Sequence, residues 1–181
     1  MLDQSLQNTE ILNQVKSRNY KQSIWTAMSH NLEVIQKLKP LKKFEIKEVT
    51  DENMLTNWLE IVETGLMGGN TLNTDVFNQL LKNPNCIFYL GFVNHKPVAT
   101  SLLFISNNIG GVYLVATLPQ YRKKGIGTQI TNCCLVEAKN NNCKEVTLQA
   151  TNLGLGVYAF LGFEIQGKIN VFNIDRIEAN C

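Results

Sequence analysis

The residues at positions 115–128 have the types and the spacing of an anion-binding turn. A β-branched, apolar segment ends at Pro119, and three basic residues and two glycines then precede a segment with helical periodicity. The first N–H groups of a helix have no partner within the helix, and the helix dipole adds positive potential there. Glycine lets the backbone approach a bulky anion. The sequence therefore predicts a phosphate-binding site made by Arg122, Lys123, Lys124, Gly125, Ile126, Gly127 and Thr128.

Two common phosphate motifs do not fit this turn. A P-loop requires a lysine between its last glycine and a serine or threonine, whereas Thr128 follows Gly127 directly. A dinucleotide-binding fingerprint requires a third glycine where this chain has Ile130. Its acidic ribose ligand should close the next strand, whereas Glu145 opens the strand expected here. Both motifs are therefore set aside.

The pattern that remains, Arg122-x-x-Gly125-x-Gly127 after a strand, resembles the coenzyme A pyrophosphate loop of the GNAT superfamily of N-acetyltransferases. The second match lies downstream, where the chain resembles the Tyr-x-x-Leu-Gly-Phe ending of that superfamily. The matching residues are Tyr158, Leu161, Gly162 and Phe163. The resemblance covers roughly residues 44–175, and details of both motifs look like one bacterial branch of the superfamily.

The resemblance implies a cofactor, acetyl-CoA, and a role for several residues. The superfamily binds the pantetheine arm to the exposed backbone of a splayed strand, which here is Val115, Ala116 and Thr117. The N–H group of either Ala116 or Thr117 would stabilise the oxyanion. Tyr158 would be the general acid that protonates the leaving thiolate, because a phenol is protonated at neutral pH. Further cofactor contacts are expected from Thr151 and Asn152, in a turn that departs from the family pattern.

A general base for the attacking amine is not evident between Gly110 and Thr117, because this strand contains no carboxylate. Glu60 and Glu63 could reach the site through water, but a solvated helix face explains them better. The remaining candidate side chains are interpreted as structural or simply exposed: His30, Trp58, Cys86 and His95.

Composition limits the class of protein. The chain has 181 residues, 44% of them hydrophobic, and a net charge of +2, which makes no general case for binding nucleic acid or a membrane surface. The five cysteines form no Cys-x-x-Cys pair, so reduced thiols and no metal site are expected. The N-terminus does not resemble a signal peptide, and the interpretation is a cytoplasmic protein, either a monomer or a homodimer.

The chain divides into two predicted parts. Apolar residues at helical spacing predict that residues 1–43 are a helical extension: Ile24, Met28, Leu32 and Ile35, with Trp25 and Leu38 widening the stripe. Residues 44–181 are predicted to form the N-acetyltransferase domain. An antiparallel meander, expected at 44–49, 87–93, 98–105 and 112–117, precedes a helix, a strand at 145–150, a short helix and final strands at 163–166 and 170–174. This order predicts an α/β (α+β) fold with a mixed, mostly antiparallel sheet flanked by helices.

The leading functional hypothesis is an acetyl-CoA-dependent N-acetyltransferase that acts on a primary amine of a small molecule or a peptide. One alternative is a module of the same fold that binds acyl-CoA without turnover. Another is a protein-lysine acetyltransferase whose N-terminal extension recruits its target. The sequence leaves the acceptor open, although Gly68 and Gly69 lie where this fold usually shapes the acceptor site.

Overall fold

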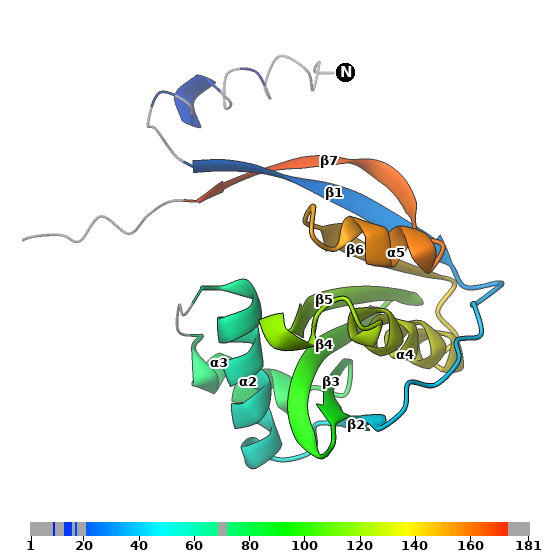
Figure 1. The fold of residues 1–181 in the computed structure, drawn as a ribbon. Helices are drawn as coiled ribbons and strands as arrows, with labels where there is room; N and C mark the ends of the chain where they lie inside the picture. The colour runs from blue at the N-terminus through cyan, green and yellow to red at the C-terminus, as the bar shows by residue number, and fades with distance from the viewer. Residues whose placement is uncertain (1–8, 10–12, 16, 18–20, 69–71, 174–181) are drawn as a thin grey trace, which may run out of the picture.

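The chain folds around a single seven-stranded sheet with the strand order β2-β3-β4-β5-β6-β1-β7 (Figure 1). This computed structural model describes residues 9, 13–15, 17, 21–68 and 72–173. The strands are β1 (Lys21–Asn31), β2 (Phe44–Glu48), β3 (Cys86–Val93), β4 (Lys96–Ser106), β5 (Ile109–Thr117), β6 (Glu145–Ala150) and β7 (Glu164–Asn173). Neighbouring strands are antiparallel except β5 and β6, which are parallel. The predicted mixed, mostly antiparallel sheet is confirmed.

Helices cover the sheet unequally. On one face, α2 (Glu52–Leu66) and α3 (Thr74–Leu81) bury a cluster with Phe88, Leu90 and Leu102. On the other face, α4 (Ile126–Asn140) and α5 (Leu155–Phe160) share a second cluster with residues of β4, β5, β6 and β1 (Figure 1). A short 3-10 turn (Pro119–Tyr121) links β5 to the loop before α4. The sheet therefore has an α2/α3 side and an α4/α5 side.

Local sequence explains where the first two helices begin. Asp51 caps α2 by accepting a hydrogen bond of 2.8 Å from the backbone N–H of Met54. Asn73 caps α3 through its side-chain oxygen. The apolar face of α2 is buried, whereas no residue of α3 is fully buried and Val76 is 48% exposed. A helix of only two turns has a narrow apolar stripe.

The predicted helix over the N-terminal apolar residues is wrong. Residues 21–31 form β1, which pairs with β6 through Thr26–Asn31 and with β7 through Lys21–Ser29. Residues four apart lie on one face of a helix, but they also lie on one face of a strand, because four is a multiple of two. The pattern alone does not decide between a helix and a strand. The segment is a strand because it pairs with β6 on one side and with β7 on the other.

Two further differences concern the ends of the domain. The sheet includes β1, so the predicted division at residue 43 runs between strands that share one sheet. The two strands predicted at 163–166 and 170–174 are one strand, β7, with a bulge where it faces Ala27 and Met28. Residue 174 lies outside the described residues. A bulge lets a strand bend without ending, so the chain continues as one strand where a break between two strands was expected.

Candidate functional site

A β-bulge in β5 separates the two halves of the sheet. Thr100 of β4 faces Ala116 and Leu102 faces Tyr113, so Leu114 and Val115 both lie opposite one residue of β4. Leu114 has a φ of 50°, and its carbonyl oxygen accepts a hydrogen bond of 2.9 Å from the Thr100 hydroxyl. A bulge bends its strand and increases the local twist. The second half of β5 therefore turns away from β6.

A gap opens between the parallel strands beyond this bulge. Strands β5 and β6 pair only along Ile109–Gly111 and Glu145–Thr147, and the rest of β5 has no partner on that side among the described residues. The Leu118 N–H donates to the Val98 carbonyl of β4. Successive N–H groups of a strand point to alternate sides. The N–H of Ala116 therefore also points to β4, and the N–H groups of Val115 and Thr117 point to the gap.

This geometry separates the two oxyanion candidates. Ala116 is 2% exposed, and its Cβ would lie 3.2 Å from a Cβ placed on Gly65 of α2. Its backbone is part of the β4–β5 ladder and its side chain packs under α2. Thr117 is half-buried and has its N–H directed into the gap. Of the two N–H groups left open by the sequence, that of Thr117 is the accessible one.

The N-terminus of α4 leaves its first N–H groups without a side-chain cap. Gly125 precedes the helix with a φ of 78°, which an L-residue with a side chain rarely adopts. No side chain caps this helix end, although Asp51 and Asn73 cap α2 and α3. The first N–H groups of α4 are therefore available to a ligand.

The three basic residues of the loop behave differently from one another. The Arg122 guanidinium donates through Nε to the Thr117 carbonyl at 3.0 Å and through NH2 to the Gly65 carbonyl at 2.9 Å. It ties the end of β5 to α2, which the sequence did not predict. The Lys124 ammonium donates to the Gln120 carbonyl and lies 5.3 Å from the centre of the Tyr121 ring. Lys123 is exposed and makes no hydrogen bond or ion pair with a described residue.

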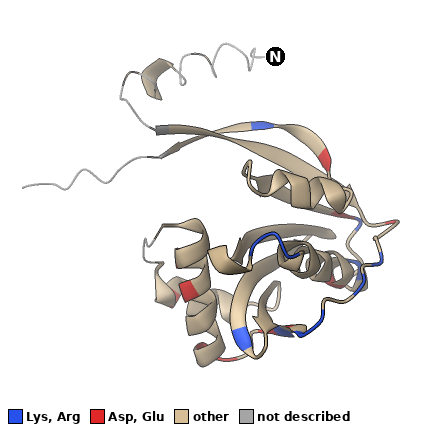
Figure 2. Ribbon diagram, in the orientation of Figure 1, with Lys and Arg blue, Asp and Glu red and all other residues tan. Residues whose placement is uncertain are grey.

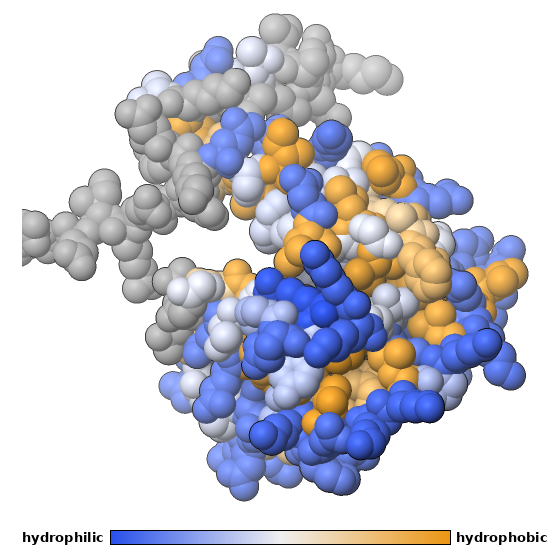
Figure 3. Space-filling model, viewed as in Figure 1, coloured by the Kyte–Doolittle hydropathy of each residue, from blue (hydrophilic) through white to orange (hydrophobic). Residues whose placement is uncertain are grey.

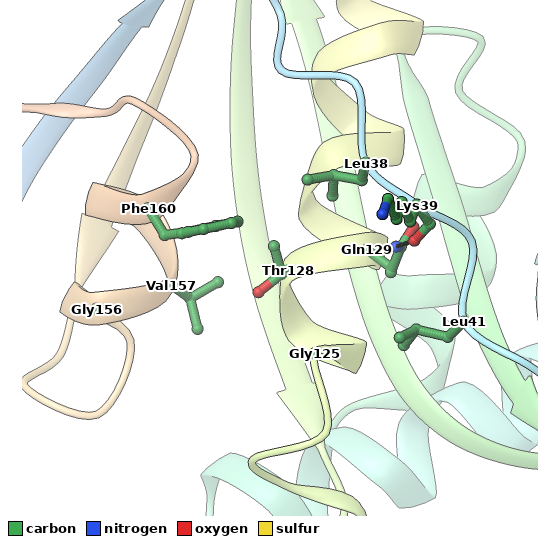
Figure 4. A pocket seen from close by; sticks show the side chains of 9 residues that line it. All are labelled: Leu38, Lys39, Leu41, Gly125, Thr128, Gln129, Gly156, Val157 and Phe160. Carbon is green, nitrogen blue, oxygen red and sulfur yellow. Dashed lines mark hydrogen bonds between the residues drawn. The ribbon is translucent and has the colours of Figure 1, made fainter.

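A groove of about 500 Å³ runs over the first turn of α4. Figure 4 shows Val157 and Phe160 of α5 on one side of the helix and Leu38, Lys39 and Leu41 on the other. The Gln129 side-chain amide donates to the Lys39 carbonyl at 2.6 Å and so holds the segment before β2 against α4. The floor of the groove is made by Gly125, Thr128, Gln129 and Gly156.

Sequence reasoning missed the residues that this segment and α5 contribute to the groove. Leu38, Lys39 and Leu41 belong to a part of the chain that was predicted to be helical, and Phe160 was assigned no role. Figure 2 shows Lys and Arg both along this segment and on the loop before α4. Positive charge therefore gathers around the groove. The only signal in the sequence was the cluster formed by Lys39, Lys42 and Lys43.

Tyr158 is a buried side chain of α5. Its side chain is 9% exposed, and its ring packs edge-to-face on the ring of Phe163, with the ring centres 5.8 Å apart. It belongs to the buried cluster that contains Ala150, the last residue of β6. A Cβ placed on Gly154 would lie 2.7 Å from the Tyr158 ring, so the ring needs a glycine one turn earlier. Burial, followed by the nearby Cys134 thiol, raises the pKa of Tyr158 to about 12. The phenol is therefore protonated throughout the physiological range.

Thr151 and Asn152, predicted cofactor contacts, form an exposed turn between β6 and α5. The Thr151 carbonyl accepts hydrogen bonds from the N–H groups of Gly154 and Leu155, and so begins α5. Both side chains are accessible at the α4/α5 end of the gap, and their part in cofactor binding stays a prediction.

The two carboxylates considered as a general base lie on α2. Glu63 accepts a hydrogen bond of 2.7 Å from the backbone N–H of Leu72, so it fixes the segment that leads into α3. Glu60 is exposed. Gly68 is described with a φ of 63°, but Gly69 lies outside the described residues. The predicted role of this loop in shaping the acceptor site stays a prediction.

The other side chains singled out by the sequence are part of the core or of the surface. Trp58 is fully buried and donates to the Ser101 carbonyl at 3.2 Å. His30 is 5% exposed and packs on Phe163, and burial raises the pKa of the Cys86 thiol. His95 lies in the exposed β3–β4 turn. Among the described residues, no cluster of His, Cys, Asp or Glu could hold a metal ion, and no helix could span a membrane.

Comparison with known proteins bears on this geometry. Residues 53–163 match the family described as Acetyltransferase (GNAT) family. This range includes the bulge in β5, the loop before α4 and the Tyr158 ending. A comparison with curated proteins finds no significant match.

Several solved structures share the fold. A GCN5-related N-acetyltransferase from Kribbella flavida is 16% identical with a TM-score of 0.67, over 91% of this chain and 64% of that one. Another from Sphaerobacter thermophilus is 15% identical with a TM-score of 0.73, over 92% and 58%. A predicted acetyltransferase from Clostridium acetobutylicum, solved with acetyl-CoA, is 23% identical with a TM-score of 0.57, over 67% and 90%. The chain therefore spans about three fifths of the first two proteins.

Proposed function

This chain belongs to the GNAT acetyltransferase family, and from that premise we propose that it transfers an acetyl group from acetyl-CoA to a primary amine. The acceptor would be a small molecule or a peptide, which attacks directly while both substrates are bound. The observation that carries the proposal is the uncapped N-terminus of α4, which lies beside the gap between β5 and β6.

The residues present fit coenzyme A. The pyrophosphate would accept hydrogen bonds from the N–H groups at the start of α4, with Gly125 and Gly127 allowing a close approach. Lys123 and Lys39 would add positive charge at the rim of the groove. The free N–H groups of Val115 and Thr117 would bind the pantetheine arm as a neighbouring strand would. The Clostridium acetobutylicum structure, which contains acetyl-CoA, supports the choice of cofactor by fold alone.

When bound, acetyl-CoA supplies an acetyl thioester whose C–S bond breaks as an amide bond forms, so that an N-acetylated product and a free thiol result. Tyr158 holds a proton at its hydroxyl oxygen and can give it to the sulfur. The N–H of Thr117 can donate to the oxygen on which negative charge develops. The proton that the amine nitrogen loses would pass to solvent water, because no described carboxylate is placed as its acceptor; Glu63 accepts a hydrogen bond from the Leu72 N–H.

The test is calorimetric titration of the full chain with acetyl-CoA, with NADH and ATP as controls. Micromolar binding of acetyl-CoA alone is the expected result, and thiol release with a panel of amines would then measure turnover. Failure to bind any coenzyme A thioester would overturn the proposal.

A second candidate function is a module that binds acyl-CoA without turnover. The hydrogen bond from the Leu72 N–H to Glu63 favours it, because it engages one of the two carboxylates considered as a general base. Repeated turnovers in the thiol-release assay would exclude this module. Target recruitment by the N-terminal segment is not testable by deleting residues 1–43, because that deletion removes β1 from the centre of one half of the sheet.

A further inference from the structure

A buried side chain of β4 holds the peptide unit between Leu114 and Val115. The Thr100 hydroxyl donates to the Leu114 carbonyl at 2.9 Å, and Thr100 is completely buried. Neither Leu114 nor Val115 has a partner in the β4–β5 register, because the bulge places both of them opposite one residue. The hydroxyl therefore joins the bulge to β4 at a point where the backbone ladder is interrupted.

The orientation of this peptide unit decides where the Val115 N–H points. The peptide bond is trans and planar, so its carbonyl and its N–H point in opposite directions. Because Thr100 holds the Leu114 carbonyl on the β4 side, the Val115 N–H points away from β4 and into the gap between β5 and β6. Thr100 thus directs a donor that it does not itself contact.

A ligand can reach the gap. Figure 3 shows the surface hollowed between the β1–β7 ribbon and the body that carries α2 and α3, and Figure 1 shows β5 along the lower side of this hollow. The paired part of β5 ends at Gly111, so the bulge and the residues after it have no strand partner on the β6 side among the described residues. The N–H that Thr100 directs is therefore on the open side of β5.

Other contacts fix the strand after the bulge without using the Leu114 carbonyl. A Cβ placed on Gly65 of α2 would lie 3.2 Å from the Ala116 Cβ, so only a small side chain fits at position 116. The Arg122 Nε donates to the Thr117 carbonyl at 3.0 Å. The peptide unit between Leu114 and Val115 is the part of this segment that depends on Thr100.

The bulge is unfavourable for the residue that forms it. Leu114 has a φ of 50°, in the left-handed region that glycine adopts readily and a leucine rarely does. Such a conformation persists only where the surrounding structure determines it. The Leu114 side chain packs on the cluster beneath α2 and α3, and the Thr100 hydroxyl binds the carbonyl of the same residue. Both contacts hold the bulge in place.

We propose that Thr100 is a positioning residue for cofactor binding: its hydroxyl fixes the Leu114 carbonyl and so directs the Val115 N–H to the pantetheine arm of acetyl-CoA. Because its side chain is completely buried, Thr100 acts through the peptide unit and not by contact with the cofactor. The inference rests on the proposed function and adds to it a residue of β4, the strand beside the one that would bind the cofactor.

Titration calorimetry of the full chain with acetyl-CoA compares two substitutions. Thr100→Val keeps the shape of the side chain and removes the hydroxyl, so the affinity should fall about tenfold. Thr100→Ser keeps the hydroxyl, and its affinity should stay within about threefold of the wild type. The matched control is Thr56→Val, which should bind like the wild type, because Thr56 of α2 also donates its hydroxyl to a backbone carbonyl at 2.9 Å, that of Glu52.

Amide hydrogen exchange measured by NMR tests the Val115 N–H directly and, in the wild type, needs no substitution. Saturating acetyl-CoA should slow the exchange of this N–H by on the order of tenfold or more in the wild type and much less in Thr100→Val. A purely structural role of Thr100 would lower the stability of Thr100→Val and leave the protection of Val115 by acetyl-CoA unchanged.

Three outcomes would each overturn the positioning role and leave the cofactor assignment intact. They are equal affinities of the wild type and Thr100→Val, equal losses in Thr100→Val and Thr100→Ser, and a Val115 N–H that stays unprotected in a wild type that binds acetyl-CoA. A wild type that binds no acetyl-CoA would instead overturn the proposed function.

Discussion

The two halves of the sheet differ in how they are covered. Strands β2–β5 lie between α2 and α3 on one side and α4 on the other, and residues such as Phe88, Leu90 and Leu103 are almost completely buried. Strands β6 and β1 share a buried cluster with α4 and α5, whereas the cluster beneath α2 and α3 contains no described residue of β6, β1 or β7, and Trp25 and Ile169 are half exposed. Burial on both faces makes a rigid frame, whereas one bare face can admit a ligand. The candidate site lies where these halves part.

On the covered half of the sheet, Gly125→Asp should cause the largest loss of acetyl-CoA affinity. An aspartate there would need a left-handed φ and would place a negative charge at the start of α4, so acetyl-CoA affinity should fall more than about 100-fold. Asparagine tolerates the same φ and carries no charge, so Gly125→Asn should lose much less acetyl-CoA affinity. Titration calorimetry of both variants separates charge from strain, and equal losses would argue against an anion site.

Tyr158→Phe should remove the proton donor and leave the pocket filled. We expect kcat to fall by on the order of 100-fold, with the affinity for acetyl-CoA within about twofold of the wild type. Tyr89→Phe is the matched control, because Tyr89 is also a buried tyrosine with a raised pKa but belongs to β3. Steady-state thiol release compares the variants. Equal kcat in wild type and Tyr158→Phe would exclude the phenol as general acid.

Arg122→Ala tests what holds the end of β5 against α2. The guanidinium joins Thr117 of β5 to Gly65 of α2, so its removal should lower the free energy of unfolding by about 2 kcal/mol. Lys123→Ala should leave stability unchanged and weaken acetyl-CoA binding. Urea unfolding and calorimetry measure the two effects. The reverse pattern would return Arg122 to the phosphate-binding role that the sequence predicted.

The raised pKa of Tyr158 gives the smallest predicted effect, seen only at alkaline pH. The folded state keeps this phenol protonated up to about pH 12, whereas the unfolded chain loses the proton near pH 10. The stabilisation is complete below pH 10 and is lost as the pH rises toward 12. Between pH 9 and 11.5, the free energy of unfolding measured in urea should fall by roughly 2 kcal/mol more for the wild type than for Tyr158→Phe. Equal losses would mean that burial does not protect this phenol.

Prediction from sequence succeeded where neighbours along the chain decide the structure. The strand predicted at 145–150 is confirmed as β6, and the four strands of the predicted meander are confirmed within three residues of their ends, since alternation and turn residues are read along the chain. It failed at β1, because the spacing of Ile24, Met28 and Leu32 suits both a helix and a strand. It also missed the hydrogen bond from Arg122 to the Gly65 carbonyl, because Gly65 is far away in the chain.

The amino-acid sequence was enough to identify the family, the mixed sheet and the glycine turn before α4, because glycines, charges and periodicity act over short distances along the chain. Tertiary structure alone decided that β1 lies between β6 and β7 and that the Thr117 N–H is free while Ala116 is not. It also put Trp25 beside the end of the gap. These features depend on which strands pair and in what register, and pairing joins residues more than a hundred positions apart.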